Sequence, residues 1–111
     1  MTVSHSDQTE PVWREATATV HGIHGLHARP AILFSRAARG YAARIQMRTA
    51  DESGEEEHWV DAKSVAKVMG LQVESGRTIL LRAAGADADA ALGGLRELVE
   101  GALAAEDEDA G

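Results

Sequence analysis

The chain contains no cysteine, only two prolines and few aromatic residues, which make up 4% of its 111 positions. Disulfide bonds, thiolate zinc sites and cysteine nucleophiles are therefore excluded. No apolar run approaches the roughly 18 residues needed to span a bilayer, and no charged-then-apolar leader is present, so we expect no membrane insertion. The composition, 44% apolar and 26% charged, is typical of one globular domain, and the lack of cysteine favours a cytoplasmic setting.

The net charge of −7 is concentrated in two acidic segments, residues 51–57 and 106–109. These segments hold nine carboxylates, so the rest of the chain has 9 acidic against 11 basic side chains and is slightly basic. A mildly basic body favours docking on acidic protein surfaces. No basic stripe with interleaved aromatics is present, so we expect no nucleic-acid partner.

Hydrophobic periodicity divides the chain into alternating strands and helices. Two-residue alternation predicts strands over 15–20, 43–48, 58–60 and 78–83. Helical spacing predicts helices over 28–39, 64–71 and 87–103, the first with Pro30 in its opening turn and Gly40 at its end. The order β-α-β-β-α-β-α predicts a single sheet covered on one face by helices. We expect residues 1–14 to be a flexible leader, 15–103 the folded domain and 104–111 a disordered acidic tail.

The segment Gly-Leu-His-Ala-Arg-Pro-Ala at 25–31 is the one that suggests chemistry. His27 stands between a glycine-containing loop and the start of a helix, a position that tends to be exposed. The first amides of a helix have no partner within it and favour an anion. Arg29 adds a planar set of donors suited to phosphate, and a neutral imidazole is a competent nucleophile. The pattern predicts a histidine that can be phosphorylated and that holds the group only modestly, as a carrier must.

Three segments make the chain resemble the histidine-containing phosphocarrier (HPr) family of the bacterial phosphoenolpyruvate-dependent phosphotransferase system. They are GLHARPA at 25–31, DAKSVAKVMGLQVESG at 61–76 and AAGADADAALGGLRELVE at 83–100. The resemblance covers about residues 15–103. It implies an α+β open-faced sandwich, in which three helices cover one face of a four-stranded antiparallel sheet. It also implies a carrier whose His27 takes a phosphoryl group from enzyme I and passes it to an enzyme IIA-type domain, with Arg29 assisting. We expect no cofactor, and a monomer is the natural expectation for a shuttle that meets several partners, although the sequence leaves the oligomeric state open.

The same resemblance gives a second group of residues a role. Ser64 would be phosphorylated by a dedicated kinase, the HPr kinase/phosphorylase, which damps the carrier function. Val65, Ala66 and Met69 would form an apolar docking patch, with Val68 and Leu71 left for the core. The chain departs from the family in its longer acidic loop at 51–57, its acidic tail and the small residue at 66, where the family often has a larger one.

Each assignment has an ordinary alternative. His27 could be a plain loop histidine, and Ser64 a plain helix N-cap. The spacing of His21, His24 and His27 invites a metal site, but no carboxylate or cysteine stands nearby to complete a ligand set, so we expect none. A competing function is a regulatory docking module, in a nitrogen-type or catabolite-control role, that acts mainly through phosphorylation-dependent binding. The sequence leaves open whether a sugar-transport or a nitrogen-linked branch is served.

Overall fold

Four strands and three helices follow one another in the predicted order. The computed structural model describes residues 11–22, 25–50 and 58–103, so most of the predicted leader, the acidic loop and the tail at 104–111 lie outside it. In chain order the elements are β1 Arg14–Thr19, α2 Ala28–Arg39, β2 Arg44–Thr49, β3 Val60–Asp61, α3 Val65–Gly70, β4 Thr78–Ala84 and α4 Ala88–Glu97. A π-helical turn, η1 Leu98–Ala102, continues α4.

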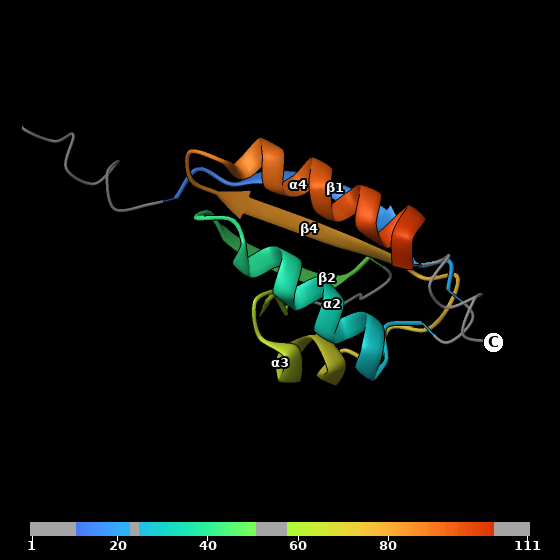
Figure 1. Cartoon of the computed structure of the whole chain (residues 1–111). Coiled ribbons are helices and arrows are strands. Elements are labelled where there is room, and N and C mark those ends of the chain that lie inside the picture. The colour runs from blue at the N-terminus through green and yellow to red at the C-terminus, as the bar shows by residue number, and fades with distance from the viewer. Residues whose placement is uncertain (1–10, 23–24, 51–57, 104–111) are drawn as a thin grey trace, which may run out of the picture.

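The strands form one antiparallel sheet in the order β1-β4-β2-β3. All three α-helices lie on the same side of it, with α4 along β1 and β4, and α2 between α4 and α3 (Figure 1). Alternate strand residues point into the layer between sheet and helices, because successive side chains in a strand face opposite sides. This buried layer contains Phe34, Ile45, Met47, Ile79, Leu81 and Leu95. The predicted open-faced α+β sandwich is confirmed.

At the start of the last helix, the carboxylate of Asp87 binds the backbone of a neighbouring loop. Asp87 occupies the N-cap of α4, but its carboxylate makes no hydrogen bond within that helix. It accepts instead from the backbone N–H groups of Ala42 and Ala43, at 2.9 and 2.8 Å. These hydrogen bonds, led by the one from Ala42, lower the pKa of Asp87. The carboxylate therefore ties the loop before β2 to the start of α4.

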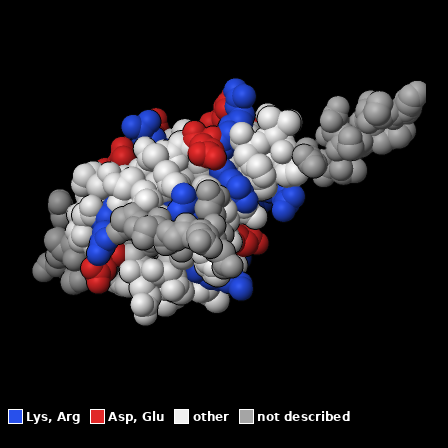
Figure 2. All heavy atoms as spheres, turned by 180° about the vertical axis from the view of Figure 1, so that it is seen from behind, with Lys and Arg blue, Asp and Glu red and all other residues white. Residues whose placement is uncertain are grey.

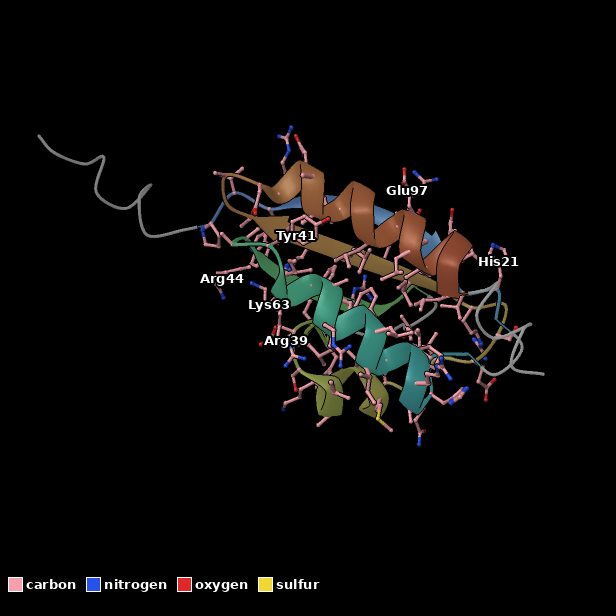
Figure 3. The ribbon with its side chains drawn as sticks, in the orientation of Figure 1. His21, Arg39, Tyr41, Arg44, Lys63 and Glu97 are labelled. Carbon is pink, nitrogen blue, oxygen red and sulfur yellow. The ribbon has the colours of Figure 1, made fainter. Side chains whose placement is uncertain are left out.

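The glycine pair inside the last helix does not interrupt it. Gly93 and Gly94 both lie within α4. Gly94 faces the ring of Tyr41, and a Cβ on Gly94 would overlap the Tyr41 hydroxyl. Figure 3 shows Tyr41 on the loop beneath this helix, near Lys63, whose Nζ donates to the Tyr41 carbonyl at 2.7 Å. Packing against Tyr41 therefore explains why residue 94 is a glycine.

The face of the sheet away from the helices is lined by a row of arginines and tryptophans. The Arg82 guanidinium lies 4.2 Å from the ring centroid of Trp13 and 4.2 Å from that of Trp59. Arg44 and Arg48 lie over the same two rings, at 5.4 and 5.2 Å. Figure 2, which views the molecule from behind, shows described acidic and basic residues interspersed on this side. Across the described residues, no helix has the length and apolarity needed to cross a membrane.

Candidate functional site

The loop that leads to His27 is held against the segment that follows α3. Gly25 has a φ of +69°, and a Cβ on it would overlap the carbonyl of Val73. The N–H of Leu26 donates to that same carbonyl at 2.9 Å, and the Leu26 side chain is buried. Only glycine tolerates both this conformation and this close approach. The backbone immediately before His27 is therefore fixed by a contact with residues nearly fifty positions later in the chain.

His27 is the N-cap residue of α2, and its side chain is exposed. Its backbone is extended, with φ −85° and ψ −159°, and its carbonyl accepts the first helical hydrogen bond, from the N–H of Ala31 at 2.9 Å. The imidazole makes no capping bond to its own helix. Pro30 is buried in the first turn, where its missing N–H costs nothing. The ring thus lies at the surface, at the end of a helix that favours anions.

Arg29 is exposed two positions after His27, in the same first turn. That turn contains no acidic residue, whereas the last turn contains Arg36 and Arg39. Carboxylates are often found in the first turn of a helix because they stabilise its positive end. Their absence here leaves the positive end of α2 without an acidic side chain of its own, which suits the binding of an external anion.

A surface hollow of about 530 Å³ lies beside His27. It is lined by Leu26, His27, Met69, Gln72, Val73, Glu74 and Ser75. The hollow brings His27 together with Met69 of the predicted docking patch, whereas Arg29, Ser64, Val65 and Ala66 are not among its lining residues. Sequence reasoning assigns no role to Gln72, because the only signal there is a polar residue directly after the predicted helix over 64–71.

Ser64 is the N-cap residue of α3, and its Oγ accepts from the N–H of Lys67 at 3.3 Å. Of the predicted docking residues, Ala66 and Met69 are exposed, whereas Val65 is half-buried and packs against the core. Ala66 lines a second hollow, of about 190 Å³, together with His58 and Leu71. Since α2 and α3 are in contact, His27 and Ser64 stand at the starts of neighbouring helices.

The predictions about metal binding concern three histidines, of which His24 lies outside the described residues. Within the described part of the chain, no three His, Cys, Asp or Glu side chains come together in a group that could hold a metal ion. The hollow beside His27 contains two ionisable side chains, those of His27 and Glu74. The chemistry that this arrangement supports is therefore that of an exposed imidazole at a helix start.

Comparisons with known proteins agree with this arrangement. Residues 14–101 match the family model described as the PTS HPr component phosphorylation site. The chain is 40% identical over 85 residues to the phosphocarrier protein HPr of Haloferax volcanii, covering 77% of this chain and 91% of that protein. It is also 40% identical over 86 residues to a multiphosphoryl transfer protein of Xanthomonas campestris, of which it spans only 10%.

Solved structures show the same likeness. The phosphocarrier protein HPr from Bacillus anthracis superposes with a TM-score of 0.70 at 30% identity, over 80% of this chain and 99% of that one. HPr from Thermoanaerobacter tengcongensis superposes with a TM-score of 0.67 at 32% identity, over 78% and 90% of the two chains. Fold, sequence and family model therefore agree, and the chain belongs to the HPr family of phosphocarriers of the phosphotransferase system.

Proposed function

We propose that His27 accepts a phosphoryl group from phosphorylated enzyme I and passes it to a histidine of an enzyme IIA-type domain. In the first step a ring nitrogen of His27 attacks phosphorus, a new N–P bond forms and the N–P bond to the donor histidine breaks. The second step is the same reaction with His27 as the donor. Because one phosphoimidazole replaces another, neither step needs a metal or an external oxidant or reductant.

The observation that supports this proposal most is the exposed imidazole at the start of α2, a helix of 12 residues with no carboxylate in its first turn. The positive end of a helix stabilises an anion by about 0.3–1 kcal/mol, and by up to about 2 kcal/mol in favourable geometry. Arg29 offers up to two parallel donors to a phosphoryl group. This modest stabilisation suits a carrier, which must release the group to the next protein.

The test is to incubate the protein with phosphoenolpyruvate and enzyme I and to compare it with His27→Ala. We expect an acid-labile phosphate on the unchanged chain and none on the variant. His21→Ala, in which another exposed histidine is removed, should be labelled normally. We expect Arg29→Lys to be labelled about tenfold more slowly, because it loses the paired donors. Labelling that persists in His27→Ala would contradict the proposal.

We also propose that phosphorylation of Ser64 by HPr kinase/phosphorylase regulates this transfer. Ser64 begins α3, and the exposed side chains of Ala66 and Met69 lie on the same short helix. A phosphate on Ser64 would add close to two negative charges beside this surface and would repel acidic partners. Ser64→Asp should therefore slow phosphoryl transfer from enzyme I, whereas Ala86→Asp, at an exposed position that does not line the hollow beside His27, serves as the matched control. Equal rates in the two variants would remove the regulatory role.

A second candidate function is a docking module whose output is phosphorylation-dependent binding of partner proteins. The exposure of Met69, 40% of its surface, favours it. The two functions differ in what His27→Ala retains. A docking module would keep its partner affinities in that variant and lose them in Met69→Asp, whereas a carrier loses its activity in both. Measuring binding and transfer side by side for the two variants separates the candidates.

A further inference from the structure

Gln72 has a backbone conformation that its residue type does not favour. Its φ of 54° makes it the only residue other than glycine with a positive φ in the part of the chain that the structure describes. It follows Leu71, the C-cap of α3, and its N–H donates to the carbonyl of Met69 at 3.0 Å. Glycine is the usual residue at this position after a helix, because any Cβ is strained in the left-handed region. A glutamine at this position therefore carries a backbone strain that a glycine would avoid.

The strained residue lies beside His27. Gln72 and His27 both line the hollow of about 530 Å³ described above. The carbonyl of the next residue, Val73, accepts the hydrogen bond from the N–H of Leu26, so the two segments that line the hollow are joined by a backbone hydrogen bond. Gln72 is exposed, and among the described residues its carboxamide has no hydrogen-bond partner. Strained backbone is found disproportionately at functional sites, where the surrounding contacts hold it in place.

We infer that the carboxamide of Gln72 donates a hydrogen bond to the phosphoryl group when His27 bears it. This inference rests on the proposed function of His27. A carboxamide donates without adding a positive charge, so it can orient the phosphoryl oxygens without holding the group too tightly for release. The other polar lining residues are less suited, since Glu74 is acidic and would repel a dianion, and Ser75 lies in the turn three residues further along the chain from α3 than Gln72.

The hydrogen bond should lengthen the life of the phosphohistidine. Hydrolysis breaks the N–P bond of His27 and transfers the phosphoryl group to water, which yields orthophosphate and free imidazole. The transition state of such a transfer is loose, with charge spread over the three phosphoryl oxygens. A donor that stabilises the phosphoryl dianion on His27 more than it stabilises this transition state slows the hydrolysis.

The experiment phosphorylates the full chain with phosphoramidate, which needs no partner protein. The N–P bond of the reagent breaks, an N–P bond to His27 forms and ammonia leaves. We expect the half-life of the phosphohistidine, followed by phosphorus NMR, to fall about fivefold in both Gln72→Gly and Gln72→Ala. Gln72→Gly should at the same time raise the melting temperature by about 5 °C, because the strain is relieved. Glu97→Ala, at an exposed position of α4 outside the hollow, is the control and should change neither quantity.

A second measurement needs no variant. In the unchanged chain, the side-chain N–H resonances of Gln72 should shift on phosphorylation, whereas those of Gln46, on the opposite face of the sheet, should not. A higher melting temperature in Gln72→Gly with unchanged half-lives in both variants would overturn the inference and leave Gln72 as a helix terminator. If His27 of the unchanged chain takes no phosphoryl group from either phosphoramidate or enzyme I, the proposed function itself fails.

Discussion

The hydroxyl of Tyr41 occupies the space into which a side chain on Gly94 would project. Its neighbour Gly93 is exposed and has nothing within 4 Å of where a Cβ would stand. Of these two adjacent glycines, only Gly94 has a packing contact that requires glycine. Gly94 allows the phenol ring to pack against α4, and no packing contact accounts for Gly93.

This difference predicts opposite effects on stability. Gly93→Ala should raise the free energy of unfolding by about 0.5–1 kcal/mol, since alanine is the better helix former. Gly94→Ala should lose that gain and lower the free energy of unfolding by about 1 kcal/mol, because the phenol must move. Urea denaturation of both variants measures the difference. In a Tyr41→Ala background the two substitutions should become equally favourable; a persistent difference there would show that Tyr41 is not the cause.

Gly25→Ala should be among the most destabilising substitutions near the site. It places a Cβ on the carbonyl of Val73 in a backbone with a φ of +69°. We expect a loss of about 2 kcal/mol or more of stability, and displacement of the loop that leads to His27. The matched control is Gly76→Ala, where φ is +89° but the space is open, and the expected loss is about 1 kcal/mol. Equal losses would mean that the contact with Val73 contributes nothing.

Asp87 should make the stability of the domain depend on pH. Hydrogen bonds from Ala42 and Ala43 lower its pKa below the ordinary value of 3.8 in the folded chain. At acidic pH the unfolded state therefore binds more protons, and stability falls as the pH falls through this range. Asp87→Asn should melt at a lower temperature than the unchanged chain at pH 7, and this difference should shrink below about pH 4. Melting curves across pH 2–7 measure it.

Asp89 supplies the comparison for that experiment. Its pKa is also lowered, by an ion pair with Arg14 at 2.6 Å, but both side chains are largely exposed. Salt screens such exposed pairs. We expect the effect of Asp89→Asn to be small and to vanish in high salt, whereas the effect of Asp87→Asn should survive. Equal salt sensitivity of the two variants would contradict the role given to the backbone hydrogen bonds.

We expect Glu100 to protect the Thr19 amide, on an edge strand of the sheet, from hydrogen exchange. Its Oε2 accepts the N–H of Thr19 at 3.0 Å, and β1 is an edge strand. Glu100→Ala should cost about 1 kcal/mol and speed hydrogen exchange at the Thr19 amide. Glu97→Ala, an exposed position one turn earlier, should change neither. If the Thr19 amide exchanges at the same rate in both variants, the hydrogen bond has no protective effect.

The sequence predicted best what depends on neighbouring residues. The bounds of α2 match the prediction because Pro30 and Gly40 mark its ends and its apolar spacing is helical throughout. The prediction of a strand over 58–60 is wrong in its bounds, since β3 spans Val60–Asp61. Its pairing with β2, and not its own residue pattern, decides where it lies.

The features that could not be predicted arise from partners far apart in the chain. Asp87 and the amide of Ala42 are 45 positions apart, so the spacing around Asp87 predicts an ordinary N-cap. The left-handed backbone of Gln72 could not be predicted from the sequence either, since glutamine has no preference for that conformation. The sequence was enough to propose His27 because its motif is local, whereas the hollow beside it is formed by two segments that meet only in the folded chain.

The arginine and tryptophan row has a practical consequence for optical experiments. Trp13 and Trp59 are the only two tryptophans of the chain, and both contact the Arg82 guanidinium on the side of the sheet opposite the helices of the described chain. Neither lines the hollow beside His27. Intrinsic fluorescence should therefore report loss of the sheet on denaturation and remain almost constant during the proposed phosphorylation of His27.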